Sequence, residues 1–245
     1  MNTQILILIP LIFLAALLFS SVGHGGASAY LATFALIGMA PTSMRPAALC
    51  LNVLVASIAL YKFYKVRAFD WQLFWPIALT SVPAAFIGGQ VTLPNPLYKA
   101  LVGACLIYAA WTIFSQANKT DEIDVNPVAK PVLMALGAGL GFLAGVTGVG
   151  GGIFLSPILL FFAWAKTRVI SGVAAAFILV NSISGLLGFL SKSPSLPAGL
   201  VYWALAAVIG GLIGAEYGSK RFANPTIRKL LAMVLVFAGS KMLLA

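Results

Sequence analysis

Hydrophobic residues form long uninterrupted runs along this chain, and glycine, proline and charged residues separate one run from the next. Such runs predict helices, since most approach the ~20 apolar residues that a helix needs to cross a bilayer. The pattern indicates about ten helical segments, at 4–22, 25–40, 45–62, 71–92, 97–115, 131–147, 152–165, 169–190, 199–219 and 226–244. We therefore predict an all-α polytopic membrane protein in which eight to ten segments span.

The composition agrees with a fold in lipid. Of the 245 residues, 61% are hydrophobic and only 8% are charged, and the mean hydropathy is +1.04. A soluble domain carries about 25% charged residues, so soluble, disordered and disulfide-scaffold proteins are excluded. The two cysteines, Cys50 and Cys105, lie inside apolar runs without disulfide or metal-site spacing. The expected surroundings are the lipid bilayer, with no metal and no cofactor.

The two halves of the chain repeat the same features in the same order. Gly23-His24-Gly25-Gly26 corresponds to Gly148-Val149-Gly150-Gly151, and Asn52 corresponds to Asn181 within a similar apolar run. Such internal similarity indicates a duplicated unit. The division that we predict is a first membrane repeat at 1–116, a polar connecting loop at 117–130 and a second membrane repeat at 131–245.

The basic residues predict the orientation. If the N-terminus lies outside, only four of the fifteen basic residues fall on that side: Arg45, Lys99, Lys192 and Lys241. Lys and Arg collect in cytoplasmic loops, so both termini are predicted on the non-cytoplasmic side of an inner membrane. This rule explains the net charge of +10 without a nucleic-acid partner. Because each repeat has an odd number of segments, the second is expected to be inverted.

Inverted repeats with short, glycine-broken segments are typical of secondary transporters, which bind substrate near the midplane. Segments 25–40 and 152–165 are the shortest and directly follow the glycine clusters. Each either crosses fully or is a half-helix packed against its predecessor. Non-helical backbone at membrane depth must be buried or line a cavity, and a helix N-terminus attracts anions.

The predicted substrate site therefore combines the two glycine breaks with polar residues of the matched apolar runs. Its predicted members are Gly23, His24, Gly25, Gly26, Asn52, Thr147, Gly148, Gly150, Gly151, Asn181 and Ser182. His24 is either an anion donor or proton carrier, or a hydrogen-bonded residue of the break. The asparagines either face the site or bond between helices. The spaced glycines Gly137, Gly141, Gly145, Gly210, Gly214 and Gly218 are interpreted as packing residues.

Two charged residues remain for gating or coupling. Arg45 either attracts anions at an entrance or anchors a helix at the membrane interface. Glu216 is the acid within an apolar segment, which makes it a candidate for coupling, although an ion pair with Lys220 four residues later is the simpler interpretation. The one histidine and five acids match no catalytic signature, so an enzyme is not expected.

The paired motifs resemble a known family. Ser21-Val22-Gly23-His24-Gly25-Gly26 and the glycine-rich run 145–152, together with Asn52 and Asn181, are similar to the duplicated signature of the TauE/SafE permeases. The resemblance implies a secondary transporter, most often an exporter, of small sulfur-containing anions such as sulfite and organosulfonates. His24 departs from the small or apolar residue that many members have there. An anion channel and a non-transporting scaffold are the alternatives, and a homo-oligomer stays open.

Overall fold

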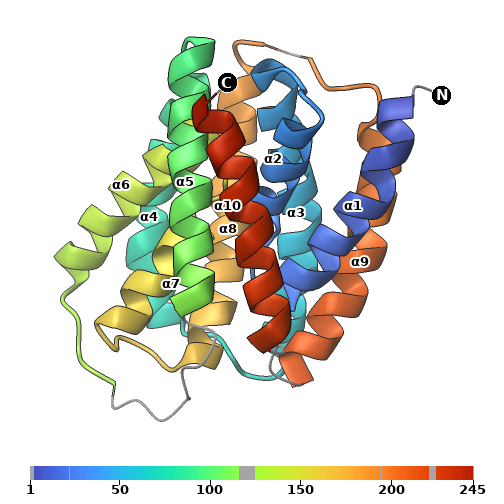
Figure 1. Cartoon of the computed structure of the whole chain (residues 1–245). Coiled ribbons are helices and arrows are strands. Elements are labelled where there is room, and N and C mark those ends of the chain that lie inside the picture. Colours follow the sequence, from blue (N-terminus) through green and yellow to red (C-terminus); the bar gives the residue numbers. More distant parts are fainter. Residues whose placement is uncertain (1–2, 22, 116–124, 194, 221–224, 245) are drawn as a thin grey trace.

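Ten helices and their connections make up the part of the chain that the computed structural model describes, residues 3–21, 23–115, 125–193, 195–220 and 225–244 (Figure 1). The helices of the first half are α1 (Thr3–Ser20), α2 (Ala27–Leu36), α3 (Pro41–Lys65), α4 (Trp71–Gln90) and α5 (Asn95–Ser115). Those of the second half are α6 (Lys130–Thr147), α7 (Gly152–Phe161), α8 (Thr167–Leu190), α9 (Leu200–Lys220) and α10 (Pro225–Leu244). Most of the predicted connecting loop, 116–124, lies outside the described residues.

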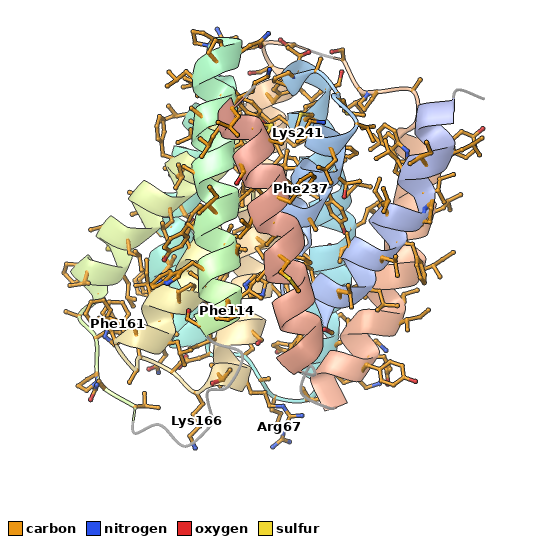
Figure 2. The ribbon with its side chains drawn as sticks, in the orientation of Figure 1. Arg67, Phe114, Phe161, Lys166, Phe237 and Lys241 are labelled. Carbon is orange, nitrogen blue, oxygen red and sulfur yellow. The ribbon has the colours of Figure 1, made fainter. Side chains whose placement is uncertain are left out.

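The outer surface is apolar, as a lipid-facing surface must be. Six described helices are long and apolar enough to cross a membrane: α3, α4, α5, α6, α8 and α9. Large side chains such as Trp111, Phe114 and Phe237 point outward from α5 and α10, and the last two are visible in Figure 2. An apolar surface of this extent has no place in water, so the protein is a multi-pass membrane protein.

The helices α2 and α7 are half-helices. Each has ten residues, which at about 1.5 Å per residue span only about half of the ~30 Å hydrocarbon core. Of the two alternatives left open by the sequence, full crossing is thus wrong. Both helices end earlier than predicted, because the chain turns away with positive φ at Gly38 (73°) and Ala163 (53°).

Helix α3 begins earlier than predicted, at Pro41 rather than at residue 45. Proline suits the first helical position because its missing N–H would have no intrahelical partner there. Arg45 therefore lies inside the helix rather than at its start.

Corresponding turns of the two halves lie at opposite ends of the molecule. The turn between α3 and α4, which contains Arg67, lies at the bottom of Figures 1 and 2, whereas the turn between α8 and α9 lies at the top. The start of α1, the end of α10 and Lys241 also lie at the top, and Lys166 lies at the bottom with Arg67. This arrangement agrees with the predicted inversion of the halves, while the side of the membrane on which each end lies stays a prediction.

Helices of opposite halves pack against each other. α1 packs along α9, and its counterpart α6 packs along α4, while α3 meets α8 and α5 meets α10. The two first pairs are close-packed through glycine. Cβ atoms at Gly137, Gly141 and Gly145 of α6 would collide with carbonyl oxygens of α4. Those at Gly210 and Gly214 of α9 would collide with carbonyl oxygens of α1, and that at Gly218 with the carbonyl oxygen of Ser21, directly after α1. The predicted packing role of these six glycines is confirmed.

The C-terminal ends of the half-helices are held by other segments. Lys241 of α10 donates to the Leu36 carbonyl of α2 over 2.7 Å. Asn126, which precedes α6, donates from its side chain to the Phe162 carbonyl after α7 over 3.2 Å. A helix C-terminus has carbonyls without intrahelical partners and a partial negative charge, so both contacts fix a short helix at the end distant from its glycine break.

Candidate functional site

The two glycine breaks lie against the same two side chains. A Cβ at Gly25 would lie 2.6 Å from Asn52 Oδ1 and 2.9 Å from Ile178 Cγ2, and a Cβ at Gly150 would lie 2.5 Å from Asn52 Nδ2 and 3.1 Å from Ile178 Cγ2. Asn52 belongs to α3 and Ile178 to α8. The structure therefore brings together motifs that are separated by half the sequence, at the place where α3 crosses α8.

Both breaks end in a glycine that starts a half-helix. Gly26 precedes α2 with φ 94°, and Gly151 precedes α7 with φ 78°, and neither helix has a side-chain N-cap. Positive φ is accessible to glycine without the penalty of a Cβ. The N–H groups of each first turn therefore point away from the helix without an intrahelical partner, at the positive end of its dipole.

Asn52 links α3 with α8 and the second break. Its side chain is fully buried, and Nδ2 donates to Ser182 Oγ over 3.3 Å and, at 3.5 Å, approaches the Val149 carbonyl. Its Oδ1 has no hydrogen-bond partner in the described part of the chain. An unpaired buried amide oxygen is costly in lipid, so Asn52 and Ser182 form the polar centre of the candidate site.

The matched Asn181 is placed differently. It is fully buried in α8, and its Nδ2 donates to the Phe177 carbonyl one turn earlier over 2.8 Å. Its Oδ1 too is without a partner among the described residues. The two asparagines thus occupy corresponding sequence positions, but the hydrogen bonds of Asn181 stay within its own helix.

His24 connects the two halves. Its Nε2 lies 3.4 Å from Ser156 Oγ of α7, and which atom donates depends on the histidine tautomer. The ring is half-buried between Gly23 and Gly25. Gly23 itself packs on α8, where its Cβ would lie 2.6 Å from the Ser171 carbonyl oxygen. His24 therefore joins the first break to the second half-helix.

The second break is held by hydrogen bonds. Thr147 Oγ1 accepts from the Val149 N–H over 3.3 Å and donates to the Leu143 carbonyl over 2.7 Å. The Thr147 carbonyl in turn accepts from Tyr98 Oη over 3.0 Å. The Thr147 hydroxyl predicted for the site is thus engaged in ending α6. Gly148 packs against Arg45, whose Cγ would lie 3.0 Å from a Cβ there.

Arg45 is not an interfacial anchor. Its side chain is 5% exposed. Nη1 donates to the Val91 carbonyl over 2.8 Å, and Nη2 donates to the carbonyls of Gly88, Gly89 and Gly145. These carbonyls lie at the C-terminal ends of α4 and α6, where the helix dipoles are negative. The buried charge therefore holds two helix ends of opposite halves together, while its role at an entrance stays a prediction.

Glu216 forms an ion pair with Lys62, while its predicted pair with Lys220 stays a prediction. Lys62 Nζ of α3 contacts Glu216 Oε2 of α9, so the pair joins two helices. The side chain of Lys220, the predicted partner, lies outside the described residues. Both members of the pair are partly exposed, and the coupling role of Glu216 stays a prediction.

Two residues near the first break were missed in the sequence. The hydroxyls of Ser28 and Tyr30, in the first turn of α2, are buried, and neither has a hydrogen-bond partner in the described parts of the chain. They stand in a run of small and apolar residues that resembles core packing. The available signal was their position directly after the glycines.

Two oppositely oriented halves with a pair of half-helices are an architecture typical of membrane transporters. The chain belongs to the TauE/SafE family, since the family described as "Sulfite exporter TauE/SafE" matches residues 8–242. No solved structure matches the chain.

Curated relatives carry names of the same kind. A "Probable membrane transporter protein" of Sinorhizobium fredii is 35% identical over 99% of this chain and 100% of its own length. Another with that name, from Methanocaldococcus jannaschii, is 24% identical over 76% of this chain and 73% of its own length. A third, from Haemophilus influenzae, is 25% identical over 67% of this chain and 66% of its own.

Proposed function

We propose that this protein is a secondary transporter that exports small sulfur-containing oxyanions, such as sulfite or organosulfonates, across the inner membrane. The observation that carries the proposal is the convergence of two uncapped half-helix N-termini on Asn52. Backbone N–H groups and helix dipoles stabilise an anion without a fixed full charge. The family match supports the choice of sulfur-containing anions.

Neutral donors suit transport because the substrate must also leave. Arg45, a cation beside the second break, already donates to four carbonyls. An anion in the site would therefore be held by N–H, amide and hydroxyl groups, whose hydrogen bonds are weaker than a salt bridge in a low dielectric. Such a site binds and releases its substrate within one cycle.

The packing suggests which parts move. The glycine contacts join α1 to α9 and α4 to α6, so each close-packed pair contains one helix of each sequence half. We assign the rocking motion of alternating access to two bundles built on these pairs, not to the sequence halves. The glycines, Asn52 and Ser182 are buried between the bundles, and the end with Arg67 and Lys166 is assigned to the cytoplasm by its charge.

The proposal is tested by flux measurements on purified protein in proteoliposomes. Saturable movement of radiolabelled sulfite, altered by a pH gradient, is the expected result, and a screen with sulfate, thiosulfate, taurine and sulfoacetate ranks substrates by thermal shift. Flux that does not saturate would indicate a channel. The absence of flux and of any thermal shift would overturn the proposal and favour a scaffold.

The site is tested by the double variant Asn52→Ala/Asn181→Ala. We expect sulfite flux to fall at least about tenfold, since roughly one hydrogen bond to a charged group is lost. Thr112→Val is the matched control, because this buried hydroxyl of α5 bonds only to the Ala109 carbonyl of its own helix among the contacts found. Unchanged flux in the double variant would show that the anion binds elsewhere.

A further inference from the structure

The two half-helices differ in the side chains of their first turns. α2 carries Ser28 and Tyr30 there, whereas the corresponding positions of α7 carry Ile153 and Leu155. The side chains of Ser28 and Tyr30 are 1% and 0% exposed, and both hydroxyls are without a hydrogen-bond partner among the described residues. Leaving a buried hydroxyl unpaired is unfavourable. The two hydroxyls of α2 therefore need an explanation, whereas the apolar first turn of α7 needs none.

The Tyr30 hydroxyl lies at the N-terminus of α2. A Cβ at Gly26, the residue that caps the helix, would lie 2.8 Å from Tyr30 Oη. This position follows from the direction of helical side chains, which lean toward the N-terminal end of their helix. The hydroxyl therefore faces the same end of α2 as the unpaired N–H groups of the first turn.

A third unpaired group lies beside the same break. Asn52 Oδ1 would contact a Cβ at Gly25 and has no partner in the described part of the chain. The two ends of an asparagine amide are assigned from their hydrogen bonds. If the amide turns over, it gives up the 3.5 Å approach of Nδ2 to the Val149 carbonyl, Oδ1 accepts from the Ser182 hydroxyl, and Nδ2 becomes a donor beside Gly25.

We propose that the anion binds asymmetrically, at the first turn of α2, where the Ser28 and Tyr30 hydroxyls, the helix N–H groups and the Asn52 amide donate to the oxygens of a small oxyanion. The N-terminus of α7 is a structural counterpart without side-chain donors in its first turn, and Ser156, in its second turn, is 3.4 Å from His24. Several donors at one helix end suit a group with several acceptor oxygens, such as sulfite or a sulfonate. This inference rests on the proposed function and names the half of the site that binds the anion.

The experiment compares hydroxyl removal at the proposed subsite with hydroxyl removal elsewhere on α2. Tyr30→Phe and Ser28→Ala each delete one unpaired hydroxyl, while Thr33→Val deletes a hydroxyl that already donates to the Ala29 carbonyl over 2.8 Å. For each purified variant, sulfite binding is measured by calorimetry, sulfite flux in proteoliposomes, and the unfolding temperature without anion.

We expect Tyr30→Phe and Ser28→Ala to raise the Kd for sulfite at least about tenfold, as befits a hydrogen bond to a charged group. Their unfolding temperatures without anion should stay equal or rise, because each loses a buried unpaired group. Thr33→Val should bind sulfite within about twofold of the unchanged protein.

Three results would overturn the inference. One is an unchanged Kd in both variants while the unchanged protein still moves sulfite, which leaves the proposed function standing. Another is an equal loss of binding in Thr33→Val, which would make the effect a general one of α2. The third is a lower unfolding temperature of Tyr30→Phe and Ser28→Ala without anion, which would give the hydroxyls a structural role. If the unchanged protein neither binds nor moves any anion of the panel, the proposed function fails with the inference.

Discussion

The two glycine breaks have the same backbone and different surroundings. Both end in a glycine with positive φ, both start a ten-residue helix without a side-chain cap, and both lie against Asn52. Around the second break, Thr147, Tyr98 and Arg45 form hydrogen bonds to backbone groups. At the first, buried hydroxyls lack hydrogen-bond partners within the described residues. A duplicated motif can thus be rigid in one copy and available to a ligand in the other.

The largest effect that distinguishes the two breaks should come from Arg45→Met. This change leaves the ends of α4 and α6 without the donor for four carbonyls, and a hydrogen bond to a charged group contributes about 1.5–3 kcal/mol. We expect the unfolding temperature in detergent to drop sharply. Lys192→Met is the control, because Lys192 is exposed, and it should change stability by less than about 0.5 kcal/mol. Equal stability of the two variants would show that the hydrogen bonds of Arg45 do not hold the ends of α4 and α6 together.

The next largest effect should come from alanine at the two caps. Gly26→Ala and Gly151→Ala each place a Cβ at positive φ, which costs about 1–2 kcal/mol. The Gly151 methyl would also lie 2.7 Å from Phe177 Cε1 and 3.1 Å from Ala144 Cβ, so its variant should melt at a lower temperature. The Gly26 methyl would lie 2.8 Å from Tyr30 Oη, so Gly26→Ala should weaken sulfite binding as well as lower the melting temperature.

Gly38→Ala separates backbone strain from contact. Gly38 has φ 73° and no atom within 4 Å of its Cβ position, so this control reports strain alone. If Gly38→Ala destabilises as much as Gly151→Ala, the contacts of the second break contribute nothing to its rigidity.

The smallest expected effect is the difference in sulfite flux between Asn52→Ala and Asn181→Ala. Asn52 contacts both breaks, whereas Asn181 bonds within α8. Asn52→Ala alone should therefore lower sulfite flux about tenfold and Asn181→Ala less than about threefold, in line with one lost hydrogen bond and none. Equal losses in a flux assay would show that the site is symmetric after all.

The apolar runs predicted the helices well because lipid selects the same side chains along a whole span. Bounds such as 71–92 and 131–147 lie close to α4 and α6. The half-helix ends were missed, since Ile37, Met39, Phe162 and Trp164 extend the apolar pattern beyond the turns at Gly38 and Ala163. Hydropathy records which residues avoid water and does not record where the chain reverses.

Side-chain partners were harder to predict than positions. Arg45 was noticed as a charge, but its partners are backbone carbonyls of α4 and α6 that no sequence pattern identifies. Tyr30 resembled an aromatic core residue, and only its burial without a partner separates it from one. The matched asparagines were singled out in the sequence, but their different hydrogen bonds depend on the crossing of α3 and α8, and their part in binding stays a prediction.

The contact between Lys241 and the Leu36 carbonyl has a consequence for biosynthesis. Lys241 belongs to α10, which follows the other nine helices that the structure describes, while Leu36 ends α2 near the start of the chain. During translation α2 is made early, and the Leu36 carbonyl lacks its contact with Lys241 until α10 leaves the ribosome. Chains fold as segments emerge in order. A product truncated before α10 would therefore lack the Lys241 hydrogen bond at the C-terminal end of α2.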